Sequence, residues 1–101
     1  MAFVRAVGAG DVPVGAIREV DLAGKAVAVA NVGGVFHAID NTCLHRGGPL
    51  GDGLLEGKIV TCPWHGWQFD VTTGKVAQNG TIGVGCYAVE LRDGDVFVDV
   101  G

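Results

Sequence analysis

The sequence lacks any long uninterrupted run of apolar residues. A helix that spans a membrane needs about 20 such residues, and no segment of the chain approaches that length. The segment from Met1 to Val7 contains one arginine and no apolar stretch leading to a cleavage site, so it does not resemble a signal peptide. The sequence therefore predicts a soluble protein that stays in the cytoplasm and has no membrane partner.

Basic residues are also scarce. Seven lysines and arginines stand against eleven acidic residues, which gives a formal net charge of −4 at pH 7. Nucleic-acid binding needs a basic patch, and the cationic residues here are scattered along the chain. The composition therefore argues against nucleic acid and against an anionic membrane surface. A partner with a basic docking face would suit this charge, because complementary fields raise association rates.

Cysteine is limited to three residues, which cannot all pair with one another within one chain. Disulfides are rare in the reducing cytoplasm. Metal binding is therefore the leading explanation for at least some of the cysteines.

Glycine, by contrast, supplies 18 of the 101 residues, which favours short strands joined by tight turns. No stretch of ten or more residues shows apolar residues at helical spacing. Gly33-Gly34 and Asp93-Gly94 suit the turns of β-hairpins. Strand-like runs occupy residues 16–22, 26–32, 35–40, 87–91 and 96–100, with shorter candidates at 58–61 and 67–71. The chain length predicts one domain, residues 1–101, with an all-β antiparallel framework that carries a glycine-rich insert at about residues 41–81.

The insert contains two short segments that each carry a cysteine and a histidine. Cys43 and His45 form one pair, and Cys62 and His65 form the other. Two facing loops would supply two sulfurs and two nitrogens, which suit zinc or an iron–sulfur cluster and exclude magnesium and calcium. A Cys2His2 zinc finger places both histidines on a helix after both cysteines. Here the residue types alternate and no helix is expected, so the order disfavours zinc.

The residues beside these ligands favour a cluster over zinc. Gly47 and Gly48 follow the first pair, and Gly66 follows the second. Small residues let main-chain N–H groups approach the sulfurs and stabilise a reduced cluster. The spacing alone leaves open whether each iron takes one cysteine and one histidine, or one iron takes both cysteines.

The ligands and their flanks together resemble the signature of Rieske iron–sulfur proteins. The matching segments are Cys43-x-His45 with Arg46-Gly47-Gly48-Pro49-Leu50, and Cys62-x-x-His65 with Gly66-Trp67-x-Phe69-Asp70. The resemblance covers nearly the whole chain and implies a Rieske-type antiparallel β-sandwich with a small, loop-rich cluster-binding subdomain. It also implies one [2Fe–2S] cluster, with both cysteines on the inner iron and both histidines on the outer iron.

The sequence lacks several side chains that are typical of high-potential Rieske proteins. High-potential respiratory members carry an extra cysteine in each loop, joined as a disulfide, and serine and tyrosine hydroxyls near the cluster. The matching positions here are Gly48 and Trp64 for the disulfide, and Trp67 and Phe69 for the hydroxyls. Fewer hydrogen bonds leave the reduced state less stabilised, so we expect a potential near or below about −100 mV.

The chain is too short to hold the separate catalytic iron domain of a Rieske oxygenase as well. It resembles the stand-alone ferredoxin of aromatic-ring-hydroxylating dioxygenase systems. That resemblance implies a monomeric one-electron carrier, not an enzyme, which accepts electrons from a flavin reductase and passes them to a terminal oxygenase. Two alternatives are a small subunit of an assimilatory nitrite reductase-like enzyme and a ferredoxin that serves another oxygenase or pathway.

Four further features complete the expectations. We interpret His37 as a structural residue of its strand and Cys86 as a small buried hydrophobic residue. Trp64, which lies between two ligands, is expected to be at least partly exposed near the cluster and to contribute docking area.

Family members usually carry a proline-bearing loop over the cluster, whereas residues 78–83 contain no proline. We therefore expect a more mobile loop there.

Overall fold

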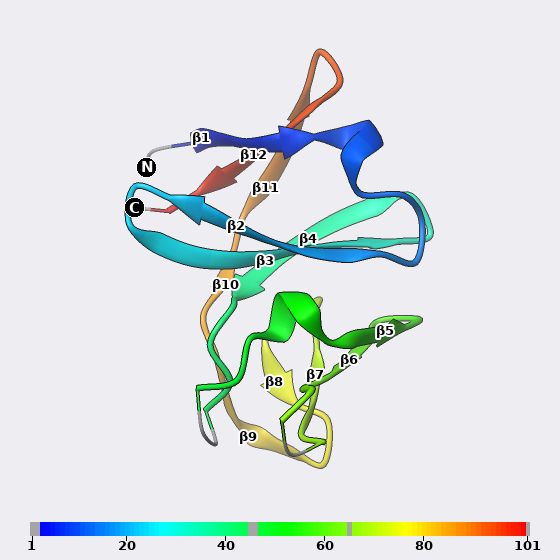
Figure 1. Cartoon of the computed structure of the whole chain (residues 1–101), viewed down its shortest axis with the longest axis vertical. Helices are drawn as coiled ribbons and strands as arrows, with labels where there is room; N and C mark the ends of the chain where they lie inside the picture. The colour runs from blue at the N-terminus through cyan, green and yellow to red at the C-terminus, as the bar shows by residue number, and fades with distance from the viewer. Residues whose placement is uncertain (1–2, 45–46, 65, 101) are drawn as a thin grey trace.

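The computed structural model describes residues 3–44, 47–64 and 66–100. These residues form twelve β-strands and two short 3-10 helices, and no α-helix occurs among them. The prediction of an all-β fold is confirmed (Figure 1). Within the same ranges, no helix has the length and apolar character needed to cross a membrane.

Three antiparallel sheets make up the fold (Figure 1). The first contains, in spatial order, β1 (Phe3–Gly8), β12 (Asp95–Asp99) and β11 (Val89–Arg92). The second contains β10 (Cys86–Tyr87), β4 (Val35–Asp40), β3 (Lys25–Val32) and β2 (Ile17–Leu22). The third contains β5 (Leu54–Glu56), β6 (Ile59–Thr61), β7 (Gln68–Asp70), β8 (Lys75–Val76) and β9 (Asn79–Gly83). The 3-10 helices are η1 (Ala9–Asp11) and η2 (Leu50–Asp52).

The first two sheets are called the framework here, and residues 41–85, between β4 and β10, are called the insert. Figure 1 shows the framework above and the insert below, with β4 ending and β10 beginning at the joint between them. The insert carries η2 and the whole third sheet. Both cysteine–histidine segments belong to the insert.

Two hairpins follow directly from their turn residues. Gly33 and Gly34 have φ of 60° and 97°, and they join Val32 to Val35, which pair across the β3–β4 hairpin. Asp93 and Gly94 have φ of 51° and 82° and join β11 to β12 in the same way. Positive φ at both central positions matches the right-handed twist of the flanking strands, and glycine adopts it without strain. The predicted hairpins are confirmed.

The β3 strand is buried on both faces and separates two hydrophobic cores. Val27 and Val29 point into the core between the two framework sheets. Ala28 and Ala30, which alternate with them, point into the core of the insert. Small alanine side chains on that face let the insert lie close against the sheet. The alternation of valine and alanine along β3 therefore allows one strand to pack against both the framework and the insert.

The expected strand at residues 87–91 is divided. Tyr87 ends β10, which pairs with β4, and Val89 begins β11, which pairs with β12. The segment therefore passes from one framework sheet to the other at Ala88. Cys86 corrects our expectation of a buried residue, because it is exposed. It lies in a two-residue edge strand, and its Sγ is 3.7 Å from the main-chain oxygen of Thr72.

The proline-free segment forms the strand β9 instead of an open loop. Gly83 passes so near Gly74 that a Cβ on Gly83 would lie 2.4 Å from the oxygen of Gly74. Within β9, Oδ1 of Asn79 accepts hydrogen bonds from the N–H and hydroxyl of Thr81 at 3.1 and 2.6 Å. Glycine and asparagine have low strand propensity, so the close approach of two backbones, and not propensity, produces this strand.

Asp70 holds the turn that follows β7. Its Oδ1 accepts hydrogen bonds from the N–H and hydroxyl of Thr72 at 2.9 and 2.6 Å, and its Oδ2 lies 3.3 Å from the ammonium of Lys58. Burial raises the pKa of the Asp70 carboxyl, but the hydrogen bonds from Thr72 and the charge of Lys58 lower it more, so the net pKa is below its ordinary value of 3.8. The carboxylate therefore stabilises the fold in its charged form.

We expect Asp70→Asn to lower the free energy of unfolding by about 1–2 kcal/mol at neutral pH, because the charge-assisted hydrogen bonds weaken. A lowered folded-state pKa gives a contribution that is present above the unfolded pKa and is lost as pH falls through the folded pKa. Wild type and variant should therefore converge as the pH falls below the ordinary carboxyl pKa. Urea denaturation followed by circular dichroism measures this, with Asp93→Asn as the control. A difference that stays the same at low pH would contradict the prediction.

Candidate metal centre

The first ligand loop starts and returns at a buried asparagine. Asn41, at the end of β4, accepts hydrogen bonds at its side-chain oxygen from the N–H of Gly51 (2.6 Å) and at its main-chain oxygen from the N–H of Leu50 (2.7 Å). A β-bridge between Thr42 and Pro49 closes the loop above it. The two ends of the loop are thus held together at the end of a framework strand.

Within this loop, the main chain turns around Cys43. The N–H of Cys43 donates to the oxygen of Gly48 at 2.9 Å, and the N–H of Gly47 donates to the oxygen of Cys43 at 2.9 Å. Gly47 has φ of 73°, which glycine adopts without strain. The turn thereby fixes the main chain on both sides of the thiol.

The second ligand loop repeats the same pattern on the β6–β7 hairpin. The N–H of Cys62 donates to the oxygen of Trp67 at 2.7 Å, and the N–H of Gly66 donates to the oxygen of Cys62 at 3.1 Å, with φ of 77° at Gly66. The loop is anchored where Thr61 pairs with Gln68, whose side chains are 3.3 Å apart. In each loop, a glycine four residues after the cysteine makes the turn. Our sequence analysis missed this equal spacing, although both glycines were visible as flanking residues.

The two loops face each other in the core of the insert. Cys43 and Cys62 are each 3% exposed and belong to one cluster of buried residues. A Cβ on Gly48 would lie only 2.6 Å from the sulfur of Cys62, so the first loop packs directly against the second thiol. The structure therefore brings together two of the four predicted ligands. His45 and His65 lie outside the described residues.

The residues that the structure describes fit an iron–sulfur cluster. Two thiols buried in one core need a positive counter-charge when ionised, and a thiophilic metal supplies it. Gly48 leaves room for the sulfur of Cys62 where any side chain would intrude. No group of three or more histidine, cysteine or acidic side chains suited to a metal occurs in the described part, from which two of the predicted ligands are missing.

Positions 48 and 64 lie opposite each other across the two loops. A Cβ on Gly48 would be 3.2 Å from the Cβ of Trp64, near the roughly 3.5–4.5 Å at which a disulfide joins two Cβ atoms. The sequence places glycine and tryptophan at these facing positions, so the loops are held together here by packing and not by a covalent bond.

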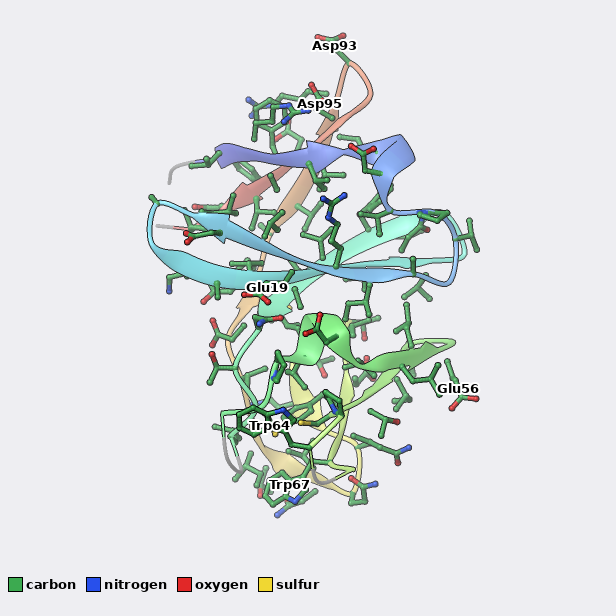
Figure 2. All side chains as sticks on the ribbon, viewed as in Figure 1. Glu19, Glu56, Trp64, Trp67, Asp93 and Asp95 are labelled. Atoms are coloured by element: carbon green, nitrogen blue, oxygen red, sulfur yellow. The ribbon has the colours of Figure 1, made fainter. Side chains whose placement is uncertain are left out.

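The surface beside the ligand loops is apolar. Trp64 is 56% exposed, as predicted, and Leu44 is 50% exposed. Each directly precedes a predicted histidine ligand in the sequence. Leu44 was missed by our sequence analysis, although its place between two ligands matches that of Trp64. Figure 2 shows Trp64 and Trp67 on the insert, at the end of the molecule away from Asp93 and Asp95.

Two hollows flank the second ligand loop and meet at Gly66. One, of about 390 Å³, lies between this loop and the β8–β9 hairpin, and its lining includes Trp67 and Ile82. The other, of about 510 Å³, lies on the side of η2 and β5, and its lining includes Asp52 and Leu54. Gly66 and its neighbours in this loop are therefore reachable from two sides.

His37 lies on neither ligand loop. It belongs to β4 and pairs with Ala30 of β3 in the framework. This position is compatible with the structural role that we expect for it.

Comparison with known proteins gives consistent matches over nearly the whole chain. The family model of the Rieske [2Fe-2S] domain matches residues 2–88. Ferredoxin CarAc from Metapseudomonas resinovorans is 38% identical over 98 residues, which cover 95% of this chain and 92% of that protein. The ferredoxin component of the naphthalene 1,2-dioxygenase system from Pseudomonas putida is 35% identical over 103 residues, which cover 97% and 95%. A chain in the solved complex of reduced oxygenase and oxidized ferredoxin in carbazole 1,9a-dioxygenase is 37% identical, with a TM-score of 0.87 over 95% of this chain and 91% of that chain.

We expect Gly48→Ala to lower the metal content of the purified protein. The new methyl group would lie 2.6 Å from the sulfur of Cys62, and such overpacking costs about 1–3 kcal/mol. Iron and acid-labile sulfide per chain are the measured quantities. Gly80→Ala is the matched control within the insert, because a Cβ there meets no atom within 4 Å. Equal metal content in the two variants would show that the loops do not need this close approach.

Proposed function

The chain belongs to the Rieske [2Fe-2S] domain family, and on that basis we propose that one [2Fe–2S] cluster is bound by four ligands, Cys43, His45, Cys62 and His65. Its relatives include the ferredoxin components of naphthalene 1,2-dioxygenase and biphenyl 2,3-dioxygenase systems. The chain is accordingly an electron carrier of such a system and not an enzyme. The buried pair of cysteines on two matching loops is the observation that carries the ligand assignment.

The burial of the cysteines favours one of the two ligand arrangements that the spacing leaves open. Cys43 and Cys62 lie in the same buried cluster, which supports both thiolates on one inner iron. Leu44 and Trp64, which precede the histidines, are half-exposed or more, which supports an outer iron on the solvent side with His45 and His65 as its ligands. When bound, the cluster supplies reversible one-electron reduction.

The protein contributes the environment that sets the potential. Phe69 is fully buried in the same core as the two cysteines and offers no hydroxyl. Gly48 offers no side chain. Because neither position carries a hydroxyl that could donate to the cluster, the added charge of the reduced state is less stabilised. We propose a potential at the low end of the Rieske range on this ground.

A solved structure supports an oxygenase as one partner. A close structural neighbour is the ferredoxin in a complex with a terminal oxygenase. We propose that this chain, as a monomer, accepts one electron from a flavin-dependent reductase and passes it to a terminal oxygenase. The apolar side chains of Trp64 and Leu44 beside the ligand loops would contribute docking area for these partners.

Elemental analysis of the anaerobically purified protein tests the ligand assignment. We expect about two iron and two acid-labile sulfide per chain. His45→Ala and His65→Ala should lose the cluster or release it readily, because each removes a ligand. His37→Ala is the control and should keep full content. One zinc per chain without sulfide, after expression with ample iron, would refute the proposal.

Voltammetry at neutral pH tests the potential. We expect a midpoint near or below about −100 mV, because the side-chain hydroxyls of high-potential members are absent. Phe69→Tyr adds a hydroxyl in the core beside the cysteines and should raise the midpoint, whereas Phe97→Tyr, in the framework strand β12, should leave it unchanged. A wild-type midpoint above about +200 mV would contradict the argument.

A further inference from the structure

The framework and the insert are connected by two chain crossings, and these crossings are hydrogen-bonded to each other. The chain enters the insert after Asp40 and returns at Gly85. The N–H of Asp40 donates to the oxygen of Gly85 at 2.9 Å, and the N–H of Gly85 donates to Oδ2 of Asp40 at 2.7 Å. One aspartate therefore holds the incoming and outgoing chain together with both its main chain and its side chain.

A tyrosine and a lysine complete this arrangement. The hydroxyl of Tyr87, in β10, donates to Oδ1 of Asp40 in a short hydrogen bond. The ammonium of Lys25, at the start of β3, donates to the Tyr87 hydroxyl at 3.1 Å and lies 5.1 Å from the centre of its ring. Burial and the contact with Asp40 raise the pKa of Tyr87, so its hydroxyl keeps the proton that it donates. Both carboxylate oxygens of Asp40 are thus used, and hydrogen bonds to a charged group are the strong ones.

The fit around Gly85 is tight. A Cβ at this position would lie 2.8 Å from Oδ2 of Asp40 and 3.1 Å from the hydroxyl of Tyr87. Any other residue would push the carboxylate away from its donors. The glycine is therefore part of the arrangement and not a spacer.

Short main-chain paths connect this arrangement to both ligand loops. Asn41, which brackets the first loop, directly follows Asp40, and Cys43 is three residues from Asp40. On the outgoing side, the N–H of Val84 donates to the oxygen of Gly74 at 2.8 Å, in the turn held by Asp70 at the end of β7. The other end of β7 carries the second loop.

Packing and hydrogen bonds together hold the joint. At η2, the insert packs on β2, because a Cβ on Gly51 would lie 2.6 Å from the main-chain nitrogen of Glu19. Figure 2 shows Glu19 beside η2 at this contact. On the β10 side, the polar bonds of Asp40 add to the packing of the neighbouring residue Ile39, which is fully buried in the core of the insert.

We propose that Asp40, Tyr87 and Gly85 form a clamp that fixes the insert on the framework and thereby positions the ligand loops for the cluster. These are positioning residues, because they act on the cluster through the loops. The inference rests on the ligand assignment proposed above. Ligands held in one geometry by their supporting bonds bind a metal more tightly and change less on reduction.

Three variants remove the clamp in different ways. Tyr87→Phe removes the hydroxyl, Asp40→Asn keeps an acceptor for Gly85 but removes the charge, and Gly85→Ala keeps every polar group and displaces the carboxylate. Arg5→Met is the control, because it breaks the ion pair with Asp95 (3.1 Å), which joins two exposed framework side chains. Tyr87→Phe is the mildest of the three, because it leaves both hydrogen bonds between Asp40 and Gly85 in place, and it can still be measured if another variant fails to fold.

We expect the clamp variants to release iron to a chelator about tenfold faster than wild type, as the loss of a hydrogen bond to a charged group implies. The electron paramagnetic resonance lines of the reduced protein should broaden, and amide exchange at Asn41 to Cys43 should accelerate. Arg5→Met should match wild type in all three. If the variants lower the urea midpoint but leave release, line width and exchange unchanged, the clamp is a source of global stability only and the proposal fails. A wild-type protein without iron and sulfide would instead refute the ligand assignment, while the exchange data would still test the clamp.

Discussion

The close approach of two loops at Gly48 is the constraint on which the rest of the structure depends. The sulfur of Cys62 occupies the space that a side chain at position 48 would need. To hold two thiols in this way, each loop must turn sharply, and each does so with a glycine four residues after its cysteine. The third sheet supports one loop and the end of β4 supports the other. The insert can therefore be understood as the set of contacts needed to hold two matching turns face to face.

The framework contributes a rigid base, because β3 serves two cores at once. Valines on one face of this strand fill the space between the framework sheets, and alanines on the other face receive the insert. A cofactor site needs its supporting residues locked by packing. Placing the insert directly against a strand buried on both faces meets that need without a helix.

Local chemistry made much of this predictable from the sequence. Gly33-Gly34 and Asp93-Gly94 specify their hairpins through positive φ. The donor types and spacing of the cysteine–histidine pairs predict a metal centre, of which the structure places the two cysteines. The features that sequence reasoning missed depend on contacts between distant residues. Strand β9 forms because Gly83 meets Gly74, and Cys86 is exposed because β10 has only two residues. Asp40 and Tyr87 are 47 residues apart, and no local pattern relates them.

The distribution of the large aromatic residues divides the molecule optically. Both tryptophans, Trp64 and Trp67, are in the insert beside the ligand loops, and the single tyrosine, Tyr87, stands at the joint. The rest of the framework contains only phenylalanine among its aromatic residues. Indole emission therefore originates only from the part of the chain that would hold the iron, where a coloured centre would quench it. Phenol emission originates from the joint, so the two intrinsic fluorophores observe the two regions separately without any added label.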